Sequence, residues 1–269
     1  MLFDASLIGT TPFEILLSDF HHFFFVFARV LGLVIGMPFL SQIEVSGRFR
    51  AVACVALTMA FAPLVSGDYF PASSTLTVAF CRFLGEFLIG FLIGLIARFA
   101  LAAVELAGHI ISFATGLSSA MVVNPSYSSQ GSLVGVFLTM SAITSFLVLD
   151  GHHMLFENLL ASYSRLTPDW FSLDSPLIKD MFKGIVILSD TLMRVGFQMS
   201  VPFLLVNTVL QFALGVLGKL VPQVQIFFLG ISLQILLGWF VLLVSMGAIL
   251  FVYEKLNTST YSIMGFAHG

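Results

Sequence analysis

The first candidates for chemistry in this sequence are ionisable residues inside long apolar segments. Three pairs of opposite charge would each share one face of a helix: Arg82 with Glu86, Asp190 with Arg194, and Arg98 with Glu105. An unpaired charge at bilayer depth costs about 2.5 kcal/mol or more, and a partner lowers that cost. The pairs therefore either permit insertion, face partner subunits or an aqueous lumen, or form a proton relay.

Motifs of known enzymes give no alternative site. The sequence contains no His-Glu-x-x-His, Gly-x-Ser-x-Gly, Walker or Gly-x-Gly-x-x-Gly motif. Asp150, His152 and His153 form a small cluster of possible zinc ligands. Adjacent histidines point about 100° apart on a helix, however, and no second ligand cluster is visible. We therefore interpret the cluster as part of a loop and predict no metal, cofactor or enzymatic activity.

The segment after residue 105 differs from the apolar runs around it. From Gly116 to Tyr127 it reads Gly-Leu-Ser-Ser-Ala-Met-Val-Val-Asn-Pro-Ser-Tyr. Because the residue before a proline favours extended backbone, we expect a helix that stops near Gly116 and a non-helical loop up to Gly131. Irregular backbone at membrane depth is tolerated only where protein or water satisfies its polar groups. Small, β-branched and methionine side chains suit a compliant stopper better than a reaction site.

Composition shows what must position these residues. The 269 residues are 58% hydrophobic and only 9% charged, with 30 phenylalanines and a mean hydropathy of +1.05. A soluble globular chain carries about 25% charged residues, so this chain must bury its exterior in lipid or in other subunits. A net charge of −3 without a polybasic stretch argues against nucleic acid as a partner. Acidic residues in the first twenty positions, with no Lys or Arg, are unlike a secretory signal.

Six apolar runs are candidates for membrane helices, at residues 20–40, 51–65, 76–104, 131–149, 183–218 and 224–253. Pro202 predicts a kink in the fifth run, and a turn around Pro222 separates it from the sixth. The polar connection 150–180 is expected to contain a short surface helix. Six spans, together with a re-entrant segment at 105–130, agree with the distribution of positive charge except at Arg165, Lys179 and Lys183.

Small and polar residues indicate dense packing between these helices. Three Gly-x-x-x-Gly pairs would allow close approach of helix backbones: Gly32 with Gly36, Gly90 with Gly94, and Gly131 with Gly135. Four glutamines in or beside the last two runs could bond between helices or line a pore: Gln198, Gln211, Gln225 and Gln234.

A series of motifs along the chain resembles the FliR family of flagellar biosynthetic proteins and its type III secretion counterparts. The motifs are Arg29-Val30 with the apolar stretch to Pro38, residues 103–108 (Ala-Val-Glu-Leu-Ala-Gly), Gly116-Leu117-Ser118 before Asn124-Pro125, Gly151-His152, and residues 222–227 (Pro-Gln-Val-Gln-Ile-Phe) before Gly230. The chain departs from the family at Asn124, where Asp is frequent, and at Asp150, where Asn is frequent. Order and spacing nevertheless match over nearly the whole chain.

This resemblance implies an all-α, membrane-associated subunit of a bacterial inner-membrane export gate. Long kinked helical hairpins would form part of a hetero-oligomeric helical cone around a conduit for unfolded export substrates. The partners would be several copies of FliP-type and FliQ-type subunits and an associated FlhB-type subunit. Much of the apolar sequence would then lie inside the assembly rather than in lipid.

By position, the resemblance assigns a plug to residues from about 113 to 130. The residues expected in this plug are Phe113, Gly116, Leu117, Ser118, Ser119, Met121, Val122, Val123, Asn124 and Pro125. The turn of the last hairpin would contain Lys219, Pro222 and Gln223.

We therefore expect a non-enzymatic core subunit that helps to form and plug a protein-export channel. With no nucleotide-binding motif in the chain, the energy for transport would come from elsewhere in the machine. The alternative is a small-molecule secondary transporter with a broken-helix site at 105–130. An intramembrane enzyme lacks a candidate nucleophile or acid pair.

Overall fold

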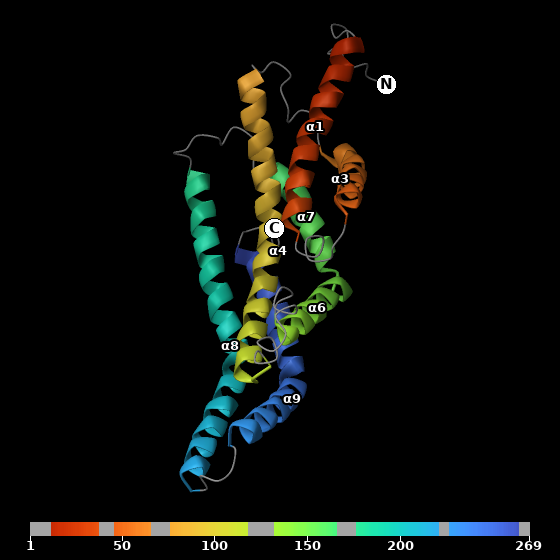
Figure 1. The fold of residues 1–269 in the computed structure, drawn as a ribbon. Coiled ribbons are helices and arrows are strands. Elements are labelled where there is room, and N and C mark those ends of the chain that lie inside the picture. The colour runs from red at the N-terminus through yellow and green to blue at the C-terminus, as the bar shows by residue number, and fades with distance from the viewer. Residues whose placement is uncertain are drawn as a thin grey trace. The chain divides into compact units, whose positions relative to one another are not determined.

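The computed structural model describes residues 12–37, 46–65, 76–117, 132–165, 176–220 and 226–263. In these ranges all regular structure is helical and no strand occurs (Figure 1), so the predicted all-α class is confirmed. The chain divides into two compact units. The first contains Met1–Arg98 and His153–Phe182, and the second contains Phe99–His152 and Lys183–His268.

The first unit is built around helix α1 (Pro12–Gly36). Val26, Val30 and Leu33 recur at helical spacing and are fully buried, so α1 presents one apolar face to its neighbours. Helix α3 (Gly47–Phe61) packs on α1 and continues into the short 3₁₀ helix η2 (Ala62–Leu64). There, Nε2 of His22 donates to the Ala62 carbonyl at 3.0 Å.

Glycines allow α1 to lie directly against helix α4 (Leu76–Ala114). A Cβ atom added at Gly90 would overlap the Arg29 carbonyl, and one at Gly94 would lie 2.7 Å from the Leu33 carbonyl. On α1, a Cβ at Gly36 would lie 2.7 Å from the Phe91 carbonyl. Two of the Gly-x-x-x-Gly pairs therefore face each other, and the backbones touch where side chains would otherwise intervene.

Helix α7 (Gly151–Arg165) belongs to the first unit from His153 onward. It is the helix expected within residues 150–180, but it is not a simple surface helix. Leu155, Leu159, Ser162 and Tyr163 lie on one face and are buried. The same polar stretch of sequence also contains the start of helix α8 (Pro176–Leu220), which begins before the apolar run at 183–218.

The second unit contains the last part of α4, helix α6 (Leu133–Val148), α8 from Lys183, and helix α9 (Ile226–Ile263). Ser132 caps α6, because its Oγ accepts from the Gly135 amide at 2.9 Å. The same hydroxyl donates to the Gly108 carbonyl of α4 at 3.2 Å. Gly108 and Gly135 lie in backbone contact, so small residues again set the helix spacing.

Within the described ranges, four helices are long and apolar enough to cross a membrane: Gly47–Leu64, Thr77–Ala114, Lys183–Leu220 and Gly230–Asn257. The number rises to five if the neighbouring helices α6 and α7 count as one bent span, against the six runs expected from the sequence. Only 11% of the α8 span and 17% of the α9 span are buried. These two helices therefore leave long apolar faces for lipid or for other proteins.

Candidate functional site

The segment assigned to a plug begins where α4 ends. The helix extends to Ala114 and is followed by a turn at residues 115–117, close to the expected stop at Gly116. Gly116 has a φ of 72°, a left-handed conformation that favours glycine and ends a helix. Phe113 differs from the prediction, because it lies in the last turn of the helix rather than in a loop, and its side chain is 77% exposed.

The rest of the expected plug is beyond what the structure describes. Ser118, Ser119, Met121, Val122, Val123, Asn124 and Pro125 all fall in the range 118–131, outside the described residues. For the alternative of a transporter with a broken helix at 105–130, α4 gives one constraint. The helix is continuous through Glu105, so any break in this segment comes after Ala114.

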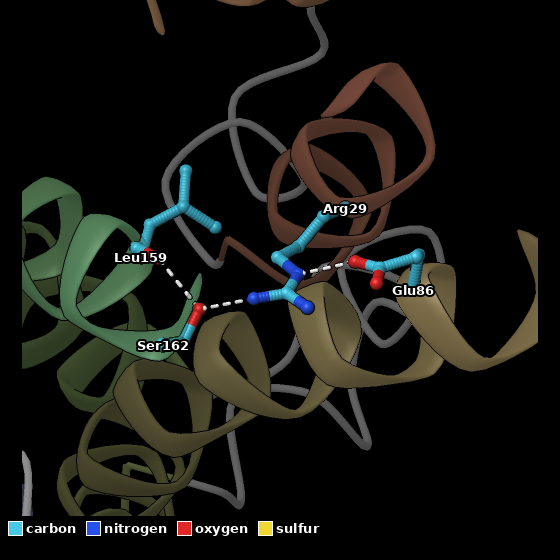
Figure 2. A network of polar contacts seen from close by, with 4 residues as sticks. All are labelled: Arg29, Glu86, Leu159 and Ser162. Carbon is cyan, nitrogen blue, oxygen red and sulfur yellow. Dashed lines mark hydrogen bonds and ion pairs between the residues drawn. The ribbon is translucent and has the colours of Figure 1, made fainter. Parts of the chain in front are cut away.

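A buried polar network joins three helices of the first unit (Figure 2). Nε of Arg29 on α1 donates to Oε2 of Glu86 on α4 at 2.5 Å. Nη1 of Arg29 donates to Oγ of Ser162 on α7 at 2.8 Å, and the Ser162 hydroxyl donates to the Leu159 carbonyl at 2.5 Å. The ring of Tyr163 lies 4.0 Å from the Arg29 guanidinium carbon, which adds a cation–π contact.

Burial makes this network an unusual feature of a chain with few charges. The side chains of Arg29 and Glu86 are both 0% exposed. The Ser162 hydroxyl accepts from Arg29 and donates its own proton to the Leu159 carbonyl, so this proton faces a main-chain carbonyl and not a basic side chain. The arrangement can hold α1, α4 and α7 in register.

The sequence predicted a different partner for Glu86. The spacing rule for a single helix suggested Arg82, whereas the structure brings in Arg29 from 57 residues away. Two signals pointed to Arg29: it interrupts the apolar run 20–40, and it lies in a motif of the family resemblance. Neither signal identifies a partner, because contacts between helices depend on how the helices cross.

The other ionisable residues of the prediction occupy more exposed positions. Nη2 of Arg194 donates to Oδ2 of Asp190 at 3.0 Å, as the spacing predicted, but the two side chains are 67% and 65% exposed. Glu105 approaches His109 at 3.9 Å, rather than Arg98 as the spacing suggested, and both side chains of that contact are about half exposed. Arg98 is itself exposed.

Two further predicted features are only partly described. Lys219 lies in the last turn of α8, where a positive charge is favourable, and it is exposed. Pro222 and Gln223 of the expected hairpin turn fall outside the described residues.

The cluster after α6 keeps the geometry of a possible metal site. One ligand atom from each of Asp150, His152 and His153 lies within 4.8 Å of the others. Asp150 has a φ of 55° and lies in the turn between α6 and α7, but His152 and His153 lie in the first turn of α7 rather than in the loop that the sequence suggested. Asp150 and His153 are exposed, and exposed clusters of this kind are common without a metal.

Comparison with known proteins identifies relatives along most of the chain. The family model described as bacterial export proteins, family 1, matches residues 20–259. The flagellar biosynthetic protein FliR of Caulobacter vibrioides is 30% identical over 85% of this chain and 89% of that protein. FliR of Bacillus subtilis strain 168 is 31% identical over 66% of this chain and 69% of its own length. FliR of Escherichia coli K12 is 28% identical over 82% of this chain and 83% of its own length.

Proposed function

Since the chain belongs to family 1 of the bacterial export proteins, we propose that it is a core subunit of the flagellar or type III export gate. Family membership and the long apolar helices make it a membrane protein of the export apparatus. In the proposed role it helps to form the channel for unfolded substrates in the bacterial inner membrane. It assembles there with FliP-type, FliQ-type and FlhB-type subunits, and it has no enzymatic activity of its own.

The observation that carries this proposal is an exposed ion pair on an apolar helix. Asp190 and Arg194 lie on the span Lys183–Leu220, yet about two thirds of each side chain is uncovered. Charged groups in membrane segments almost always face protein or a water-filled cavity, because lipid does not solvate them. The α8 surface around this pair therefore needs a polar neighbour, which a partner subunit or an aqueous conduit would provide.

The end of α4 supports a plug in the segment that follows it. The helix stops at a left-handed glycine, and the large side chain of Phe113 projects from its last turn. Residues 113–130 would then form the stopper, with the helix end as its fixed base. Glycine at position 116 adopts the left-handed conformation that ends the helix without the strain that a side chain would add.

The test of the assembly uses native mass measurement after gentle solubilisation. We expect the full chain, co-expressed with its neighbouring export genes, to appear in a hetero-oligomer with those subunits. A stable monomer or homodimer that takes up a small solute on its own would overturn the proposal and favour the transporter alternative.

The test of the plug is a deletion of Ser118–Val123. In the proposed role this deletion leaves assembly intact and raises ion leakage across the membrane, measured per assembled complex. The control is Glu157→Gln, a change at an exposed position on α7. Equal leakage in the two assembled complexes would refute the plug.

A further inference from the structure

Helices α1 and α4 touch at their glycines and separate toward their N-terminal ends (Figure 1). Gly90 approaches Arg29 and Gly94 approaches Leu33, so residue numbers rise together along the contact and the two helices run in the same direction. His21 lies about 16 Å along α1 from Gly32, at about 1.5 Å per residue. Over this distance, phenylalanines replace glycines between the two helices.

A pocket of about 740 Å³ opens between the separated parts of the two helices, and we call it the α1/α4 pocket. Four phenylalanines form much of its described wall: Phe24 and Phe25 from α1, and Phe80 and Phe83 from α4. The rings of Phe24 and Phe83 stack with their centroids 4.7 Å apart, which joins the two walls. The volume is within the range of about 300–1,000 Å³ that is typical of ligand-binding pockets.

The two polar residues described in its lining, His21 and Thr77, lie at one end of the pocket. Each marks the start of an apolar helical segment, His21–Gly36 on α1 and Thr77–Ala114 on α4. Because the two helices are parallel, both starts lie at the same end, and the aromatic residues follow. Imidazole and hydroxyl groups can hydrogen-bond to phosphate oxygens. The pocket therefore combines a polar entrance with an aromatic interior.

The lining favours an apolar chain over an aqueous lumen or another helix. None of the described residues that line the pocket is Asp, Glu, Lys or Arg, in contrast to the α8 surface with its ion pair. Phe24 and Phe80 are 43% and 66% exposed, so a flexible apolar chain would bury exposed ring surface. A helix about 10 Å across occupies about 420 Å³ per turn, so the pocket would hold fewer than two turns.

We propose that the α1/α4 pocket binds one acyl chain of a membrane phospholipid, with the head group beside His21 and Thr77. The membrane supplies this ligand, since the α4 wall lies in the first two turns of a helix long and apolar enough to span it. Bound lipid would fill the space beyond the glycine contact and hold the N-terminal ends of α1 and α4 at a fixed separation. The proposal goes beyond the export role and depends only on the membrane location of the chain.

The experiment uses a phosphatidylethanolamine that carries a photoreactive diazirine in one acyl chain. A trace amount is added to bacterial membrane vesicles that contain the full chain with its partner subunits. Mass spectrometry of peptides measures labelling at residues 21–25 and 77–83 relative to the exposed face of α9, the reference for lipid that only surrounds the protein. We expect stronger labelling of the pocket peptides. Labelling no stronger than that of α9 would overturn the proposal.

A matched pair of serine variants locates the labelling. Phe80→Ser removes an exposed residue of the wall, and Phe49→Ser makes the same change at a position on α3 that is 57% exposed and outside the described lining. We expect Phe80→Ser to lower labelling of the pocket peptides about tenfold, the change that corresponds to loss of about 55 Å² of apolar contact. Phe49→Ser should leave it unchanged. Equal labelling in the two variants would contradict binding in the pocket.

A second pair covers a failure of Phe80→Ser to fold. Ala79→Phe adds a ring to the lining and should block the pocket, whereas Ala56→Phe adds the same ring at an exposed position on α3. Only Ala79→Phe should reduce labelling of the pocket peptides, and equal labelling would again count against the proposal. The comparison with α9 in the unaltered chain requires neither variant.

A photo-crosslinking amino acid identifies any other occupant. With p-benzoylphenylalanine at position 80, ultraviolet light should join the chain to phospholipid, which is detected as an increase in mass. A crosslink to another protein, to a second copy or to a distant segment of this chain, in place of lipid, would overturn the proposal and identify that occupant.

Discussion

Replacing Glu86 with glutamine tests the buried ion pair of the first unit most directly. The carboxylate and the Arg29 guanidinium are both 0% exposed and are joined by a bond of 2.5 Å. Glutamine keeps the shape of glutamate and an oxygen acceptor but removes the negative charge, so the buried guanidinium loses the carboxylate that neutralises it. Breaking one side of such a pair costs about 3–5 kcal/mol. We expect the free energy of unfolding to fall by that amount.

A buried thiol gives the assay. The sequence has two cysteines, of which Cys54 is 0% exposed on α3. In a Cys81→Ser background, a dye that fluoresces on reaction with thiols reports the unfolding of this region in detergent. The control is Glu157→Gln, which removes an exposed carboxylate on α7 in the same unit. A change at an exposed position usually alters stability by about 0.5 kcal/mol or less, so this variant should unfold almost like the parent chain.

The double variant Arg29→Met with Glu86→Gln supplies the decisive comparison. Because both charges are then absent, no buried charge is left uncompensated, and the double variant should be more stable than Glu86→Gln alone. The reasoning is refuted if Glu86→Gln unfolds like Glu157→Gln. It is also refuted if the loss of stability in the double variant equals the sum of the losses caused by Arg29→Met alone and Glu86→Gln alone.

Three further predictions concern the free energy of unfolding, measured by the loss of helical circular dichroism so that both units are reported. Gly90→Ala should destabilise the chain by about 1–3 kcal/mol because its Cβ would overlap the Arg29 carbonyl. Gly215 has open space around it, so Gly215→Ala should be neutral or slightly stabilising. Equal effects of the two changes would contradict the close helix contact. Gly116→Ala should cost about 1–2 kcal/mol, since its φ of 72° strains any residue with a Cβ, and a neutral result would argue against the left-handed turn. Ser162→Ala should cost about 1–3 kcal/mol through loss of the acceptor for Arg29, and no loss of stability would show that the hydroxyl is dispensable.

Much of the helical framework could be predicted from hydrophobicity alone. The run 131–149 corresponds closely to α6, and the expected stop near Gly116 lies next to the observed end of α4 at Ala114. The pairing of Asp190 with Arg194 also followed from sequence, because residues four apart on one helix are neighbours whatever surrounds them.

Contacts between helices were harder to predict, and the reason is physical. Glu86 bonds to Arg29 because Gly32 and Gly90 bring α1 and α4 into backbone contact, and the sequence alone does not give the crossing point of two helices. Helix α7 was expected on the surface because it has polar residues, yet the apolar residues Leu155 and Leu159 share one face with Ser162 and become buried.

Polar groups are scarce in this chain, and their placement in the structure separates two roles. Arg29, Glu86 and Gln234 are bonded to groups on other helices, where an unsatisfied group would be costly, so they fix internal geometry. Asp190 and Arg194 instead pair with each other on an uncovered face of a membrane-length helix. Packing inside this chain does not account for the second placement. A leucine at either position would insert into lipid more easily than a charged residue. The exposed pair is therefore best explained by a polar neighbour outside this chain, and the face of α8 that carries it is where we expect a partner subunit or the conduit itself to lie.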